Sequence, residues 1–95
     1  MRVVHCKREK HDVYIGRPSI FGNPFSIGRD GNREQVIEKY RAYFLEKIKN
    51  NERFRKAVEG LRGKVIACWC KPLACHGDVI VEYLRVVEYL RGGAK

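Results

Sequence analysis

The 95-residue chain is long enough for one compact domain and too short for two. Its 44% apolar content is an ordinary supply for a hydrophobic core, which excludes a wholly disordered chain. Lysine and arginine number 20 against 11 acidic residues, and the formal net charge of +9 favours anionic partners without defining a site.

The first third of the chain predicts two short strands and a long loop. β-forming residues predict one strand over residues 2–6 and another over residues 12–15. The next stretch, as far as Asn32, is rich in glycine and contains two prolines, which interrupt regular structure. We therefore expect a loop there, at the end of the second strand.

The middle of the chain predicts two amphipathic helices. Apolar residues recur at three- and four-residue steps after Asn32, a residue suited to an N-cap. Asn50 and Asn51 interrupt this pattern. The same spacing then continues until Gly60 and Gly63, which end the second helix.

The last third of the chain predicts a central strand and a final helix. Lys64–Cys70 is a short apolar run, typical of a covered strand, which we expect beside the first strand. Helical spacing resumes near Gly77 and stops at Gly92 and Gly93. The order of elements predicts a single small α/β domain over residues 1–95, with a sheet of few strands and about three helices.

One candidate site is the glycine- and arginine-containing loop, in which the triplet Ile-Gly-Arg occurs twice. Glycine lets the backbone approach a ligand closely, and the planar guanidinium group suits phosphate or carboxylate. The alternative is a structural loop held by proline, with its aromatic side chains packed in the core. The candidate ligand-binding residues are Tyr14, Gly16, Arg17, Asn23 and Arg29.

A second candidate site is the segment CWCKPLACHGD, which holds three thiols, an imidazole and a carboxylate in residues 68–78. A helix that begins near Gly77 would direct its unpaired N–H groups at Cys75 and lower the pKa of that thiol. The candidate catalytic residues are Cys75 as nucleophile, His76 as acid or base, and Asp78 as their support. For Asp78, a helix cap without chemistry is an equally good interpretation.

Two other interpretations of the cysteines stay open. Zinc is a possible cofactor, with Cys68, Cys70, Cys75 and His76 as candidate ligands, although their spacing departs from the usual zinc knuckles. Alternatively the cysteines are core residues, or a disulfide joins Cys6 to Cys68 or Cys70 as in hyperthermophiles. The charged fraction of 33% agrees with a thermophilic source.

The chain shows no sign of export or of membrane insertion. Its longest uncharged apolar run, Val65–Cys70, has six residues, far fewer than the roughly 20 of a membrane-spanning helix. The first ten residues are rich in charge and lack the apolar block of a signal peptide. We therefore expect a cytoplasmic protein without a membrane partner.

Two segments, YIGRPSIFGNPFSIGRDG and CWCKPLACHGD, resemble a family of small prokaryotic and phage domains of unknown function. The resemblance spans nearly the whole chain, with Phe21 where the family pattern tends to have tryptophan. It implies which positions matter and implies no activity. The matched positions are Tyr14, Gly16, Arg17, Pro18, Gly22, Asn23, Pro24 and Phe25, then Cys68, Trp69, Cys70, Pro72, Cys75, His76, Gly77 and Asp78.

These observations lead to one functional hypothesis and two alternatives. If the strands run in parallel, the loop and the cysteine segment leave the same edge of the sheet and form one pocket. We expect this pocket to bind a nucleotide or another phosphorylated ligand, with hydrolysis as the candidate reaction. The alternatives are a zinc-stabilised module that binds nucleic acid without catalysis, and a structural domain whose cysteines are core residues.

Overall fold

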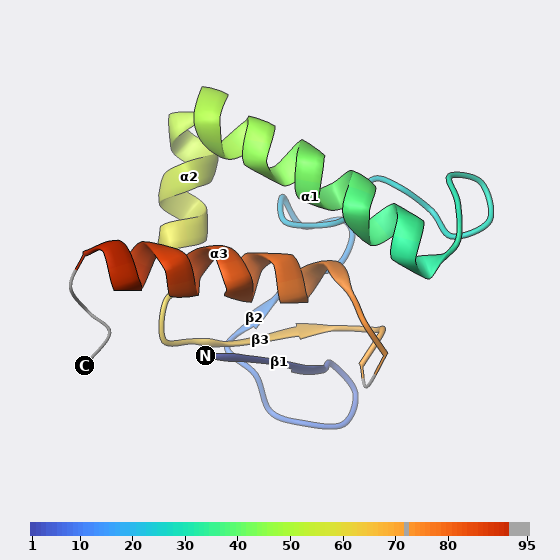
Figure 1. The fold of residues 1–95 in the computed structure, drawn as a ribbon. Coiled ribbons are helices and arrows are strands. Elements are labelled where there is room, and N and C mark those ends of the chain that lie inside the picture. Colours follow the sequence, from blue (N-terminus) through green and yellow to red (C-terminus); the bar gives the residue numbers. More distant parts are fainter. Residues whose placement is uncertain (72, 92–95) are drawn as a thin grey trace.

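A three-stranded parallel sheet lies below the helices in the computed structural model, which describes residues 1–71 and 73–91 (Figure 1). The strands are β1 (Arg2–His5), β2 (Val13–Tyr14) and β3 (Val65–Cys68), in the order β1-β3-β2. This arrangement confirms the predicted α/β class. It also confirms the expected pairing of the first strand with the central strand.

The strands are shorter than predicted because their outer residues leave the ladder. Cys6 N–H still bonds to the carbonyl of Cys68 at 3.0 Å, and Ile15 N–H bonds to that of Ala67 at 2.9 Å. The chain then turns away from the sheet at both places. Trp69 therefore lies beyond the end of β3, where strand alternation no longer governs its direction.

Three helices complete the fold, and each begins where the sequence predicts. They are α1 (Arg33–Asn50), α2 (Glu52–Glu59) and α3 (His76–Leu90). The Asn32 side chain accepts the Gln35 N–H at 2.8 Å, and the Gln35 side chain accepts the Asn32 N–H at 2.8 Å. This capping box fixes the first turn of α1.

Asn51 separates α1 from α2 by serving both helices. Its N–H bonds to the carbonyl of Lys47 at 2.9 Å, and its side chain accepts the Phe54 N–H at 3.0 Å. The predicted end of the last helix at Gly92 and Gly93 lies outside the described residues.

The core lies between the sheet and the helices. α3 packs on β1 and β3, and α1 packs on α2 and α3. Tyr40 is fully buried in this core and donates its hydroxyl to the carbonyl of Phe21 at 2.8 Å, which joins α1 to the loop after β2. The largest fully buried side chains are Tyr40, Phe44, Ile15, Ile66, Ile80, Leu84, Val58, Cys68 and Cys75.

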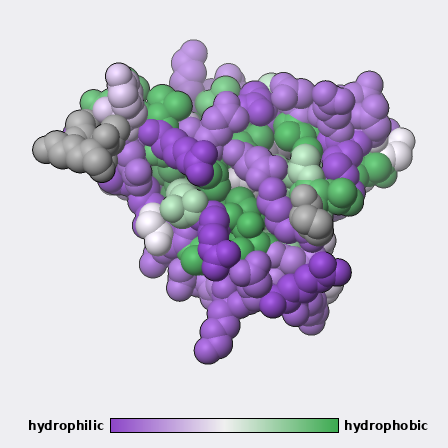
Figure 2. Space-filling model, turned by 60° about the horizontal axis from the view of Figure 1, so that its bottom comes forward, coloured by the Kyte–Doolittle hydropathy of each residue, from purple (hydrophilic) through white to green (hydrophobic). Residues whose placement is uncertain are grey.

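The face turned forward in Figure 2 is mostly hydrophilic, and hydrophobic residues show between the polar ones rather than as one continuous apolar surface. Among the described residues, no helix combines the length and the apolar character needed to cross a membrane.

The parallel pairing positions the two sequence motifs. β1 and β2 both run parallel to β3, so the carboxyl ends of all three strands lie at one edge of the sheet. The loop after β2 and the turn after β3 leave from this edge, which is where open α/β sheets carry their ligands. We call residues 16–31 the Gly-Arg loop and residues 68–78 the Cys-His turn.

Candidate functional site

A cavity of about 490 Å³ lies where the Gly-Arg loop, the start of α1 and the Cys-His turn meet. The expectation that both motifs share one pocket is thus met by the geometry. The predicted residues that line the cavity are Tyr14, Gly16, Arg17, Asn23, Cys68, Cys70, Cys75 and His76. Arg29 and Asp78 do not line it.

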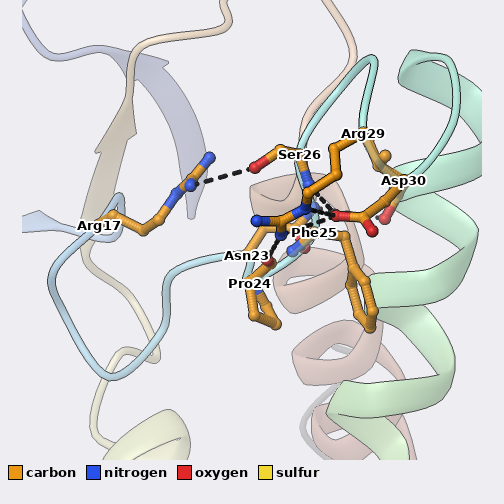
Figure 3. Close-up of polar contacts among 8 residues, drawn as sticks. Arg17, Asn23, Pro24, Phe25, Ser26, Arg29 and Asp30 are labelled. Atoms are coloured by element: carbon orange, nitrogen blue, oxygen red, sulfur yellow. Dashed lines mark hydrogen bonds and ion pairs between the residues drawn. The ribbon is translucent and has the colours of Figure 1, made fainter.

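Two guanidinium groups give the cavity its charge. Arg17 and Arg33 both line it, and no aspartate or glutamate does so among the described residues. Arg17 Nη1 donates to the Ser26 hydroxyl at 3.4 Å, as Figure 3 shows, and Arg33 Nη1 donates to the carbonyl of Ala74 at 3.1 Å. Each guanidinium group has five N–H donors, so several remain for a ligand.

Sequence reasoning missed Arg33. It is the first residue of α1 and directly follows the Asn32 cap, so the capping box that starts the helix also fixes where Arg33 emerges. Its bond to Ala74 joins the start of α1 to the Cys-His turn. Its position next to the predicted cap and the arginine-containing loop was the available signal.

Asn23 shapes the Gly-Arg loop from within. Its Oδ1 accepts the Phe25 N–H at 2.9 Å, and its Nδ2 donates to the carbonyl of Val36 at 3.3 Å. Both ends of the side-chain amide are therefore engaged by the protein. Asn23 holds the loop against α1 and also lines the cavity; Figure 3 shows its side chain among the polar groups of the loop.

The second arginine of the repeated triplet has a different role from the first. Arg29 donates to the Asp30 carboxylate at 3.0 Å and to the carbonyl of Pro24 at 3.1 Å. Asp30 also accepts the Ser26 N–H at 2.8 Å, and the Arg29 and Ser26 hydrogen bonds lower its pKa. Arg29 thus closes the loop on Asp30 and Pro24 (Figure 3) and does not line the cavity, so its predicted ligand-binding role stays a prediction.

Gly16 allows a compact start to the Gly-Arg loop. A Cβ atom at this position would collide with the Tyr14 ring, whose hydroxyl donates to the carbonyl of Arg17 at 3.2 Å. Only glycine therefore lets the Tyr14 ring fold over the backbone and line the cavity. The close neighbour of Gly16 is thus the chain's own Tyr14 ring, and the expected approach of a ligand to this backbone stays a prediction.

Cys75 occupies the N-cap of α3 and is 1% exposed. Its Sγ lies 3.1 Å from Cys68 Sγ. The hydrogen bond from Cys68 lowers the pKa of Cys75 against the effect of burial, with help from the Gly77 N–H. A hydrogen bond to Cys68 and burial raise the pKa of Cys70. Among these thiols, Cys75 is therefore the one whose thiolate the cluster favours.

His76 is 7% exposed and is oriented by the backbone. Its Nε2 lies 2.8 Å from the carbonyl oxygen of Ile15, which can only accept, so Nε2 carries the proton. Burial lowers the pKa of His76, so the imidazole is neutral near pH 7 and its Nδ1 is unprotonated. Its ring packs edge-on against Tyr40, with 5.0 Å between ring centroids.

Asp78 caps the helix rather than orienting His76. Its carboxylate accepts the Cys75 N–H at 3.1 Å and pairs with Lys71 Nζ at 2.6 Å. Both Asp78 and Lys71 line a neighbouring groove instead of the cavity. The Ile15 carbonyl holds the imidazole in the way predicted for Asp78, so the cap interpretation describes this residue.

The zinc interpretation finds no assembled site. Over residues 1–71 and 73–91, no three histidine, cysteine, aspartate or glutamate side chains are grouped to hold a metal ion. The four cysteines are free thiols, Cys6 among them, so the suggested disulfide from Cys6 to Cys68 or Cys70 is absent.

Trp69 is one of the positions that the family resemblance marked, but the strand pattern predicts a different place for its side chain. The run over residues 64–70 predicts that its side chain packs against the far side of the strand. Instead β3 ends at Cys68, and Trp69 is 57% exposed and lines the cavity. The prediction was wrong because it extended strand alternation two residues too far.

Comparisons with known proteins agree on one family. The family described as Domain of unknown function (DUF4326) matches residues 3–86. An uncharacterised 12.4 kDa protein in the nrdA-td intergenic region of Enterobacteria phage T4 is 41% identical over 82 residues, 85% of this chain and 74% of that protein. An uncharacterised protein of Acanthamoeba polyphaga mimivirus is 33% identical over 110 residues, 90% of this chain and 81% of that protein. No solved structure matches. The chain belongs to the DUF4326 family.

Proposed function

We propose that the chain binds a nucleotide or another phosphorylated ligand in the cavity between the Gly-Arg loop and the Cys-His turn. One observation carries this proposal: two motifs far apart in the sequence line one cavity that contains two arginines and no acidic side chain among the described residues. Its volume of about 490 Å³ suits a small molecule of nucleotide size.

Arg17 and Arg33 would bind the phosphate. They come from different elements, the Gly-Arg loop and the first turn of α1, and both line the same cavity. A guanidinium group presents parallel N–H donors that match two phosphate oxygens, and such charge-assisted bonds are stronger than neutral ones. The hydrogen bonds to Ser26 and Ala74 hold each group in place before the ligand arrives.

Hydrolysis is the reaction that the buried side of the cavity supports. The Cys75 thiolate would attack the ester phosphorus, forming an S–P bond as the bond to the leaving oxygen breaks and that oxygen takes a proton from solvent. Water would then cleave the S–P bond and give its proton to Nδ1 of the neutral His76. The hydrogen bond from Cys68 lowers the pKa of Cys75 and so favours its thiolate, and burial lowers the pKa of His76 and so keeps the imidazole neutral near pH 7.

The two Ile-Gly-Arg triplets offer a matched test of binding. Titration calorimetry with AMP compares Arg17→Ala, which loses a cavity residue, with Arg29→Ala, which loses only the contacts to Asp30 and Pro24. We expect Arg17→Ala to weaken binding by about 10- to 100-fold, the effect of losing charged hydrogen bonds, and Arg29→Ala to bind as the parent does. Equal affinities for all three proteins would overturn the proposal.

The hydrolytic step has its own test. Phosphate release from nucleoside monophosphates should disappear in Cys75→Ser, while this variant still binds AMP in the calorimeter. If Cys75→Ser releases phosphate at the parent rate, Cys75 is not the nucleophile and the reaction is wrongly assigned, even where binding holds.

A further inference from the structure

Trp69 is the only tryptophan of the chain, and its large apolar ring is exposed at the cavity. It directly follows Cys68, the last residue of β3, and lines the cavity together with its two sequence neighbours, Cys68 and Cys70. Large aromatic side chains are usually buried, and this one is 57% exposed. Neither the proposed phosphate contact nor the thiol chemistry uses it.

The ring is nevertheless held in place. His5 meets it edge-on, with 5.7 Å between ring centroids and 82° between the planes. Lys7 Nζ lies 5.5 Å from the centre of the indole ring, a cation-π distance. His5 is the last residue of β1 and Lys7 lies in the turn that follows, so the end of the first strand and this turn position Trp69 while more than half of the residue stays exposed.

We infer that Trp69 is the stacking surface for the aromatic base of the ligand, so that the ligand class is a nucleotide rather than a sugar phosphate. This inference rests on the proposed phosphate site. Arg17, Arg33 and Trp69 line the same cavity, so one molecule can place its phosphate on the arginines and its base on the indole. Every nucleobase has a π-face, and stacking on an aromatic side chain contributes strongly to binding.

A single nucleotide fits these observations better than a nucleic acid strand. Strand-binding surfaces usually present several aromatic residues along a continuous basic groove. Here one exposed indole lies at a cavity of about 490 Å³, which accommodates one nucleotide. The inference therefore assigns a mononucleotide, and a strand is a distinct outcome of the test.

AMP and ribose 5-phosphate form a matched pair of probes because they differ only in the base. With one tryptophan in the chain, fluorescence excited at wavelengths that tyrosine does not absorb reports on Trp69 alone. We expect AMP to change this fluorescence saturably. We expect ribose 5-phosphate to bind about 5- to 100-fold more weakly in calorimetry, the range of one stacking contact.

Variants separate stacking from other roles of the residue. Trp69→Leu should weaken AMP binding by about 5- to 100-fold and leave ribose 5-phosphate binding unchanged, and Trp69→Phe should restore much of the AMP affinity. Tyr89→Leu is the control, since Tyr89 is a 69% exposed aromatic residue on α3 away from the cavity. Its AMP affinity should equal that of the parent.

The possible failures are distinguishable. If AMP and ribose 5-phosphate bind equally well and both depend on Arg17, the base site is wrong and the phosphate site stands. If Trp69→Leu weakens the binding of AMP and of ribose 5-phosphate by the same factor, Trp69 does not act by stacking on the base. If a short single-stranded oligonucleotide binds far more tightly than AMP, the mononucleotide assignment fails. If no phosphorylated probe binds, the proposed function itself fails.

Discussion

The Gly-Arg loop and the Cys-His turn form the same cavity by opposite means. The loop is held by hydrogen bonds among partly or fully exposed groups, such as those of Asp30 with Arg29 and Ser26. The turn is held by burial, with Cys75 and His76 almost inaccessible. The loop therefore supplies shape and positive charge, and the turn supplies groups with shifted pKa values.

This difference follows from the dielectric environment. Burial disfavours the charged form of His76, so the turn holds a neutral imidazole. Hydrogen bonds are stronger in a buried site, and the one from Cys68 lowers the pKa of the neighbouring Cys75 thiol. Exposed side chains stay in contact with water. This suits the cavity arginines, because a ligand can replace the water molecules bound to their guanidinium groups. Substitutions in the turn should therefore change stability and pH dependence, and those of the loop residues that line the cavity should change affinity.

The largest expected effect is in the turn, at Gly77. A Cβ there would lie 2.8 Å from Ile15 Cδ1 and 2.9 Å from Val3 Cγ1, so in Gly77→Ala either these side chains or α3 must shift. We expect a loss of about 1–3 kcal/mol in the free energy of unfolding, measured by urea denaturation. Gly60→Ala is the control, because the φ of −66° at Gly60 accommodates alanine and a Cβ there would come no closer than 3.3 Å to another atom, the Ala57 carbonyl oxygen. Equal stability of both variants would contradict the packing described for the turn.

The next effect is in the loop, at Asn23. Asn23→Ala removes the acceptor of Phe25 N–H and the donor to Val36, at a cost of about 1–2 kcal/mol in urea denaturation. Because the loop shapes the cavity, AMP affinity should fall as well. Asn50→Ala loses one exposed contact to Glu46 and should change neither quantity. An Asn23→Ala protein with parent affinity would show that the loop does not shape the site.

A smaller effect is the pH dependence of stability that His76 introduces. Its folded pKa lies below the usual value of 6.5, so as the pH falls through 6.5 the unfolded chain takes up a proton that the folded chain refuses. Stability should fall below pH 6.5 until the lower folded pKa is reached, by about 1.4 kcal/mol for each unit of lowering.

The variant His76→Gln, which keeps a donor for Ile15, tests this slope. Urea denaturation between pH 7 and about pH 5 should show a shallower dependence in His76→Gln than in the parent. Identical slopes in the two proteins would mean that the imidazole is not held neutral by burial.

The smallest expected effect is a shift in one pKa. Cys68 is the main cause of the lowered pKa of Cys75, so Cys68→Ala should raise the pKa of that thiol. Thiolate absorbance in the ultraviolet, followed against pH and compared with Cys75→Ala, measures it. Cys68→Ser retains a hydroxyl donor and should restore part of the lowering. If the pKa of Cys75 is the same in Cys68→Ala as in the parent, the hydrogen bond from Cys68 is not the cause of its lowering.

The fold and the meeting of the two motifs could be predicted from the sequence because they depend on local signals. Asn32 and Asn51 have side chains that cap helices, and they mark where α1 and α2 begin. The apolar run that became β3 identified the central strand, and parallel pairing then brought the loop and the turn to one edge.

The partners of individual side chains could not be predicted in the same way. The orienting group of His76 is the carbonyl of Ile15, and a backbone carbonyl has no sequence signature. The two Ile-Gly-Arg triplets have the same sequence, yet Arg29 pairs with the Asp30 carboxylate while Arg17 lines the cavity. Trp69 became visible as a site residue only when the end of β3 was known.

The most direct test of the central claim is a titration of the isotope-labelled chain with AMP, followed by amide chemical shifts in NMR. The account predicts saturable shifts at Gly16, Arg17, Arg33 and His76, together with the indole N–H of Trp69. It also predicts that Arg17→Ala weakens all of them together. Shifts confined to the neighbouring groove with Lys71 and Asp78, or no saturable shifts, would contradict a phosphate site between the loop and the turn.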